Sequence, residues 1–196
     1  MLPTELRHSV LTCWCNRALA ATGERGRSLL ASACASVFLG LVLVPAPAET
    51  YIQTEVGADG QLRIVTKDRR EIVPKKEPDQ VAFEMPRISP DGRAVGWLAL
   101  YPNCCTSYPI PLKLVIYASG KLRTFTGSGL PIWRWCFQAG RKQVAFEQET
   151  VHGGIGVHYE LRAVTTGRLV ANYDPDRNSD TIGHPPKWVT ELDSQR

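Results

Sequence analysis

The stretch Ser89-Pro90-Asp91-Gly92-Arg93-Ala94-Val95-Gly96-Trp97 predicts a tight turn that leads into a buried strand. Pro90 presets the backbone for the second turn position, Asp91 suits the third, and Gly92 closes the turn. A second stretch, residues 136–146, is similar, and each of the two is followed by a strand and a hairpin signal. Matching positions are 47 to 49 residues apart. A fixed offset of this length indicates a repeat whose unit is one four-stranded sheet.

Short runs of β-branched and aromatic residues, bounded by turn residues, extend along the chain outward from these two stretches. They predict an all-β protein in which the only helix is a short one near the end, over residues 186–195. Asp59-Gly60, Ser119-Gly120 and Thr166-Gly167 predict hairpin turns, since glycine readily adopts a positive φ. The predicted strands are residues 51–56, 61–66, 81–88, 94–101, 112–118, 122–126, 132–138, 143–149, 157–164 and 169–173.

Ser89-Pro90-Asp91-Gly92-Arg93-x-Val95-x-Trp97 resembles the WD40-like propeller repeat of TolB and related envelope proteins. Pro131-x-Trp133 resembles the Pro-x-Trp pair that often opens the next blade in that family. Residues 158–168 resemble its third strand and the hairpin that follows, so the resemblance covers roughly residues 81–173. It implies blade-like antiparallel sheets of four strands and a protein partner in the cell envelope.

The repeats divide the chain into five predicted parts. These are residues 1–48, an N-terminal extension and signal peptide; 49–87, N-terminal strands that form at most a partial repeat; 88–130 and 131–173, two propeller-like repeats; and 174–196, a tail with the short helix. Propellers have four to eight blades, so the chain is predicted to be an incomplete propeller. The sheets then pack face to face, have capped edges, or are completed by other chains.

The N-terminal region predicts export. Residues 28–44 are apolar and uncharged, Arg25 and Arg27 precede them, and Ala46-x-Ala48 follows. A basic region, an apolar run and a small-residue site together describe a secretory signal peptide. We expect cleavage between Ala48 and Glu49 and a periplasmic or secreted protein with no stable membrane insertion afterwards. The alternative is an uncleaved N-terminal anchor.

The charge balance gives no indication of a nucleic-acid partner. After Ala48 the chain keeps 19 of its 23 Lys and Arg residues and 17 of its 19 Asp and Glu residues. Nucleic-acid-binding domains normally show a strong basic footprint. We therefore expect an envelope protein partner or self-association, and no cofactor.

Three cysteines follow the predicted cleavage site: Cys104, Cys105 and Cys136. Disulfides are common in exported proteins. The first expectation is a disulfide between Cys136 and either Cys104 or Cys105. A strained vicinal ring of Cys104 and Cys105, or three buried free thiols, are the alternatives.

The segment 103–111 is long for a connection between adjacent strands, and long structured loops often carry function. A binding surface of exposed aromatic and polar side chains is predicted near it. The alternative is that the two tryptophans divide between the core and the surface. The predicted surface consists of Tyr101, Asn103, Tyr108, Trp133 and Trp135.

The enzyme alternative depends on histidine and acidic residues. His152 and His158, with Glu147 or Glu149, are candidates for a small secreted hydrolase or a metal-dependent enzyme, but Gly-x-Ser-x-Gly is absent. The alternation of Asp174, Asp176, Asn178 and Asp180 is typical of calcium loops, although Ser179 and Pro185 replace two residues such a loop requires.

The leading hypothesis is a non-enzymatic binding module without a resident metal. A subunit that completes a propeller by oligomerisation is the third alternative.

Overall fold

The computed structural model describes residues 49–154, 156–175 and 184–195, so the predicted signal peptide lies outside the described residues. Within these ranges the chain forms eleven strands and one short helix. They are β1 (Tyr51–Val56), β2 (Leu62–Thr66), β3 (Glu71–Ile72), β4 (Ala82–Ile88), β5 (Val95–Tyr101), β6 (Ile110–Ala118), β7 (Lys121–Phe125), β8 (Ile132–Gln138), β9 (Gln143–Gln148), β10 (His158–Ala163), β11 (Leu169–Tyr173) and α1 (Lys187–Asp193).

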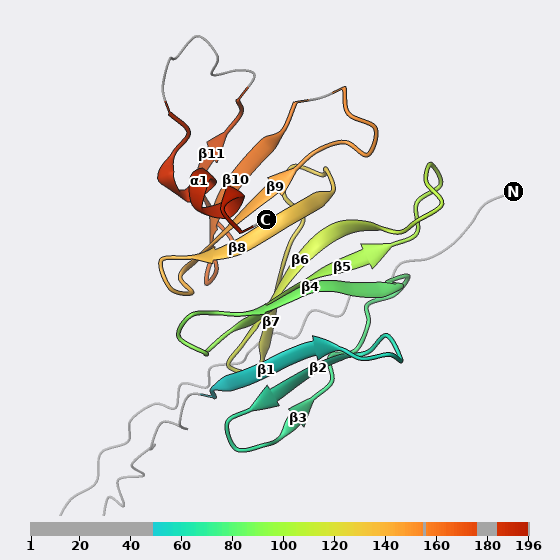
Figure 1. Cartoon of the computed structure of the whole chain (residues 1–196), viewed down its shortest axis with the longest axis vertical. Helices are drawn as coiled ribbons and strands as arrows, with labels where there is room; N and C mark the ends of the chain where they lie inside the picture. The colour runs from blue at the N-terminus through green and yellow to red at the C-terminus, as the bar shows by residue number, and fades with distance from the viewer. Residues whose placement is uncertain (1–48, 155, 176–183, 196) are drawn as a thin grey trace, which may run out of the picture. The chain divides into compact units, whose positions relative to one another are not determined.

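The strands form three antiparallel sheets in which each strand pairs with its neighbours in the chain (Figure 1). The first sheet is β1-β2-β3, the second is β4-β5-β6-β7, and the third is β8-β9-β10-β11. The all-β prediction is confirmed. The second sheet begins at Ala82, so its first strand starts inside the segment 49–87 that the sequence assigns to the N-terminal strands.

The second sheet is buried on both faces. All seven residues of β5 are buried, and they alternate between two apolar clusters. Trp97 belongs to the cluster that includes Leu62 of β2, whereas Leu98 belongs to the cluster that includes Trp135 of β8. Since successive side chains of a strand point to opposite faces, the second sheet packs against the first on one face and against the third on the other.

The far face of the first sheet is polar. Glu55 of β1 lies opposite Arg63 of β2, and Gln53 lies opposite Val65. The Arg63 guanidinium pairs with Asp59 at 2.5 Å and with a carboxylate of β3 at 3.2 Å. This face therefore offers few apolar side chains for a further sheet to cover.

The far face of the third sheet is covered by α1. Val189 and Leu192 are both 1% exposed and belong to one apolar cluster with Cys136, Tyr159 and Leu161. The helix follows Pro186, a residue whose fixed φ suits a helix start. The predicted terminal helix is confirmed. Within the described ranges no helical segment has both the length and the apolar character that membrane crossing requires.

The Ser89–Gly92 turn has the predicted form and also joins two sheets. The Ser89 hydroxyl accepts the Ala94 N–H at 2.9 Å, and Gly92 has a φ of +68°. The Tyr51 N–H donates to the Gly92 carbonyl at 2.7 Å. A Cβ at Gly92 would lie 3.3 Å from the Tyr51 carbonyl oxygen. Glycine is therefore required both for the turn and for the close approach of β1.

Candidate functional site

The β5–β6 loop presents two adjacent thiols and a tyrosine to solvent. Cys104 and Cys105 are exposed, with their Sγ atoms 3.2 Å apart, and Tyr108 is 51% exposed. The Asn103 Oδ1 accepts the Cys105 N–H at 3.3 Å, and its Nδ2 donates to Thr106 Oγ1 at 3.2 Å. The Thr106 hydroxyl in turn donates to the Tyr108 carbonyl at 2.5 Å. A chain of hydrogen bonds therefore connects the backbone N–H of Cys105 to the backbone carbonyl of Tyr108.

A carboxylate holds the base of this loop. Glu77 Oε2 accepts the Tyr101 hydroxyl at 2.8 Å and pairs with the Lys113 ammonium, which lies 4.9 Å from the centre of the Tyr101 ring. The hydrogen bond from Lys113 lowers the pKa of Glu77 despite partial burial. Tyr101 is 8% exposed, so this group positions the loop and offers little of the tyrosine to a partner.

Replacing Lys113 with methionine is expected to reduce stability in a pH-dependent way. The lowered pKa of Glu77 means that the pair stabilises the protein above the ordinary carboxyl value of 4.5, and that this stabilisation is lost as the pH falls through the lowered pKa. The loss at pH 7 should be at most about 1 kcal/mol because the pair is partly exposed. Urea unfolding at pH 7 and pH 3 measures it. Lys121→Met is the control, and an equal loss for Lys113→Met at both pH values contradicts the prediction.

The structure does not bring the five predicted surface residues together on one exposed face. Trp135 is 0% exposed and Tyr101 is 8% exposed. Trp133 is half-buried, and its indole N–H donates to the Glu149 carbonyl at 3.0 Å. The prediction that Tyr101 and Trp135 belong to an exposed aromatic surface is therefore corrected. Tyr101 lies in the apolar cluster between the first and second sheets, and Trp135 lies in the cluster between the second and third. Tyr108 remains as the exposed aromatic residue of the five.

The structure also leaves the predicted disulfide of Cys136 unformed. Cys136 is a free thiol, 1% exposed, in the cluster beneath α1, and burial raises its pKa. Cys104 and Cys105 are free thiols in the β5–β6 loop and are not part of that cluster. Cys136 thus lies beneath α1 in the third sheet, whereas the other two thiols lie in an exposed loop of the second sheet.

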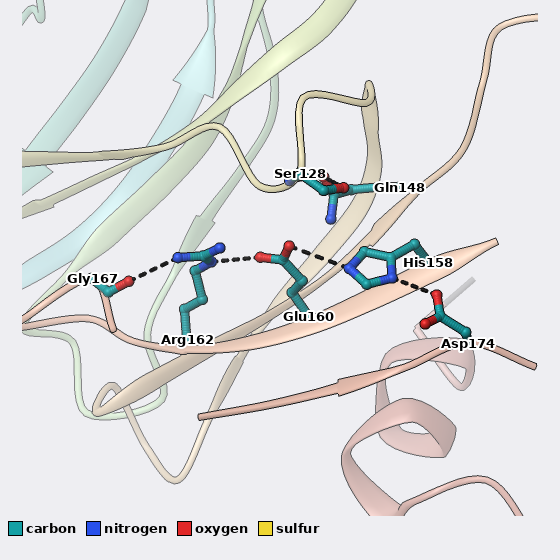
Figure 2. Close-up of polar contacts among 7 residues, drawn as sticks. All are labelled: Ser128, Gln148, His158, Glu160, Arg162, Gly167 and Asp174. Atoms are coloured by element: carbon teal, nitrogen blue, oxygen red, sulfur yellow. Dashed lines mark hydrogen bonds and ion pairs between the residues drawn. The ribbon is translucent and has the colours of Figure 1, made fainter. Parts of the chain in front are cut away.

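A row of charged side chains runs along β10, on the face of the third sheet that is turned toward the second sheet (Figure 2). His158 Nδ1 lies 2.5 Å from Asp174 Oδ1, and His158 Nε2 lies 3.3 Å from Glu160 Oε1. Arg162 Nε donates to Glu160 Oε2 at 2.5 Å, and its Nη1 donates to the Gly167 carbonyl at 3.1 Å. Glu160 is 3% exposed, and the Arg162 guanidinium supplies a positive charge beside it.

Gln148 lies directly opposite His158 on β9 and is 0% exposed. Its Oε1 accepts the Ser128 N–H at 2.8 Å and the Ser128 hydroxyl at 3.2 Å. Because Oε1 must face these donors, Nε2 points away from them, and it has no hydrogen-bond partner among the described residues. Figure 2 shows Gln148 beside the charged row of β10.

The remaining candidates for chemistry do not converge. His152 is exposed in the β9–β10 connection, Glu147 pairs with Arg134, and the two ring nitrogens of His158 already face carboxylates. Asp174 contacts His158, whereas Asp176, Asn178 and Asp180 lie outside the described residues. In the part of the chain that the structure describes, no three His, Cys, Asp or Glu side chains are placed to hold a metal ion.

A cleft that was not predicted lies among the hairpin turns. Its volume is about 680 Å³, and its lining includes Asp91, Arg141, Lys142 and Arg168. A second cavity of about 340 Å³ shares Arg141 and adds the basic side chains of β7, Lys121 and Arg123. Of these five basic residues, only Arg141 has a carboxylate partner within the described ranges: Asp91, at 2.7 Å. We call the two cavities together the hairpin-end cleft.

A repeated dipeptide in the sequence marks this cleft. Each of four hairpin turns contains glycine followed by a basic residue, and antiparallel pairing of successive strands places these turns at the same end of their sheet. The side chains of the hairpin-end cleft come from both four-stranded sheets. The dipeptides are Gly92-Arg93, Gly120-Lys121, Gly140-Arg141 and Gly167-Arg168.

No protein-family model matches the chain, and no curated protein matches its sequence. The resemblance to the TolB repeat therefore stays a prediction that depends on the quoted residues.

Proposed function

We propose that the protein is an exported, non-enzymatic binding module of the TolB-like propeller-repeat type, and that it acts by binding a protein partner in the cell envelope. The observation that carries this proposal is the hairpin-end cleft. Five basic side chains and one carboxylate line it, although the chain after Ala48 is nearly balanced in charge. A cleft lined by one sign of charge concentrates ligands of the opposite sign. The partner therefore presents an acidic segment to this cleft.

The arrangement of the sheets supports a self-contained module. Sheets that pack face to face and follow one another in the chain are what propeller-type repeats form. The outer face of the first sheet is polar, and α1 packs on the outer face of the third sheet. Neither end of the stack therefore requires a further sheet to cover it. A subunit that completes a ring with other chains would need an apolar face at one end. This favours a module that binds a partner over one that assembles into a larger propeller.

The row on β10 supports a structural rather than a catalytic role for His158. A histidine that acts as a general base needs one ring nitrogen facing the group whose proton it takes. In this protein both ring nitrogens of His158 face carboxylates, Asp174 on one side and Glu160 on the other. The alternative of a hydrolase that uses His152 and His158 therefore has less support than the binding module.

Cross-linking from within the cleft tests the proposed function. Val170 lines the cleft and is 39% exposed, so a photo-reactive amino acid placed there should cross-link the partner in intact cells. The matched control is Val73, which is 48% exposed and follows β3. We expect a defined cross-linked product from position 170 and none of the same size from position 73.

Charge reversal then tests the chemistry of the partner. Arg168→Glu combined with Lys142→Glu should reduce the Val170 cross-link several-fold, because like charges now oppose the acidic segment. Val73→Glu, at a position that does not line the cleft, should leave the product unchanged. Equal cross-linking from both positions, or a product indifferent to charge reversal, contradicts the proposal.

A further inference from the structure

The β5–β6 loop carries two adjacent sulfur atoms that a reagent in solution can reach. Cys104 and Cys105 are exposed with Sγ atoms 3.2 Å apart, whereas Cys136 is buried beneath α1. We propose that Cys104 and Cys105 are a reversible redox site, which alternates between a dithiol and a vicinal disulfide by exchange with a disulfide-bearing oxidant. This site is separate from the hairpin-end cleft and does not depend on the proposed function.

The exchange proceeds in two balanced steps. One cysteine, as its thiolate, attacks a sulfur of the oxidant's disulfide; a mixed disulfide forms and one thiolate leaves. The neighbouring cysteine, as its thiolate, attacks the sulfur of the first cysteine, and the second half of the oxidant leaves as a thiolate. Two electrons pass from the cysteine pair to the oxidant, which ends as two thiols. The Sγ distance of 3.2 Å places the second nucleophile next to the sulfur it attacks.

The two thiols influence each other's ionisation. The hydrogen bond from the Cys104 side chain, followed by its charge, raises the pKa of Cys105. The pair therefore resists losing both protons together. This suits a stepwise exchange in which one sulfur reacts first and the other follows.

The geometry of adjacent residues makes the product a switch and not a structural crosslink. Successive Cα atoms are about 3.8 Å apart across a trans peptide and about 2.9 Å apart across a cis one. Ordinary disulfides join Cα atoms about 4.4–6.8 Å apart, and deviations store strain that makes the bond easier to reduce. Strained, exposed disulfides are the labile ones. A bond between Cys104 and Cys105 is therefore readily reversed.

Oxidation also changes the hydrogen bonds of the loop. The Cys105 N–H donates to Asn103 Oδ1, and Asn103 is connected through Thr106 to the Tyr108 carbonyl. Closing a ring across the peptide bond between the two cysteines alters the direction of that N–H. The oxidised and reduced forms therefore differ in the position of the loop that carries Tyr108.

Peptide mapping of the full-length chain tests the redox site. The reduced protein is treated with oxidised glutathione, free thiols are alkylated, and the protein is digested with trypsin. Residues 94–113 form one tryptic peptide with both exposed cysteines, and residues 135–141 form another with Cys136. We expect the 94–113 peptide to lose the mass of two hydrogen atoms and to carry no alkyl group, and we expect a reductant to reverse this. A persistent glutathione adduct, a crosslink between the two peptides, or an unchanged peptide overturns the proposal.

Single variants separate the three thiols that follow the predicted cleavage site, Cys104, Cys105 and Cys136. Cys104→Ser and Cys105→Ser should each stop at the glutathione adduct, whereas Cys136→Ser should still form the vicinal bond. Hydrogen exchange of the amides of residues 103–108 should differ between the oxidised and reduced forms, with β2 as the unaffected reference. Loop amides that exchange identically in both forms contradict the link to Tyr108.

Discussion

Replacing Trp135 with alanine is expected to lower the free energy of unfolding by about 3–5 kcal/mol, the usual cost of truncating a buried tryptophan. The side chain is 0% exposed and lies in the cluster shared by the second and third sheets. Its indole N–H donates to the Met85 carbonyl at 3.2 Å, and its ring centre lies 5.2 Å from that of Phe137. Since small domains are stable by only about 5–15 kcal/mol, this variant should be close to unfolding.

The backbone of β4 explains why this hydrogen bond forms. The register of β4 with β5 shifts between Glu84 and Arg87, and Met85 has a φ of +48°. A bulge of this kind redirects the carbonyl of the extra residue away from the ladder. The Met85 carbonyl thereby reaches the indole of a tryptophan in the next sheet.

Two further variants make the Trp135 prediction decisive. Trp135→Phe keeps an aromatic ring but leaves the Met85 carbonyl without its donor, so its loss should be intermediate. Trp133→Ala removes the same kind of side chain from a half-buried position on the same strand and should cost less than Trp135→Ala. Urea unfolding followed by circular dichroism measures all three. Equal losses at positions 133 and 135 would show that the core is not arranged as described.

The strands could be predicted because their signals are local. The bounds of β1, β8 and β11 agree with the runs of β-branched and aromatic residues that predicted them. The turns follow from glycine, since Gly120 and Gly167 have the positive φ values that their places in the sequence indicated. By contrast, β3 has only two residues, too few for any alternation to be recognised.

The surface could not be predicted in the same way, because burial depends on contacts between distant parts of the chain. Strict alternation along β8 would place Trp133 and Trp135 on one face, but the register with β9 shifts between Ile132 and Arg134, and Trp135 shares its apolar cluster with Ile132. Gly96 carried a usable signal: a Cβ there would lie 2.4 Å from Trp135 Cη2. A glycine inside a predicted strand often marks a close approach by another element. Likewise, the glycine-basic pairs at four turns could have predicted the hairpin-end cleft.

Removing Arg162 from the row on β10 is the second change with a large expected effect. Arg162→Leu leaves Glu160, whose side chain is 4% exposed, with His158 as its one remaining partner on the strand. Breaking a buried ion pair from one side costs about 3–5 kcal/mol because the other charge stays buried and uncompensated. The 24% exposure of the Arg162 side chain lets water reach part of the site, so we expect about 3 kcal/mol. Arg168→Leu, an exposed arginine on the same hairpin, is the control for loss of a surface charge.

The double variant Glu160→Leu with Arg162→Leu decides whether the loss comes from the uncompensated charge. Glu160 lies opposite Phe146, and Arg162 lies opposite Val144, so two leucines would pack on apolar neighbours. Replacing both members of a buried pair with apolar residues is often neutral or stabilising. The double variant should therefore be more stable than Arg162→Leu alone, although it removes more polar contacts. Glu160→Leu alone is measured as well. If the losses of Glu160→Leu and Arg162→Leu simply add in the double variant in urea unfolding, the row stabilises the protein through its individual hydrogen bonds. The charge of Glu160 would then not be the reason that Arg162 is required.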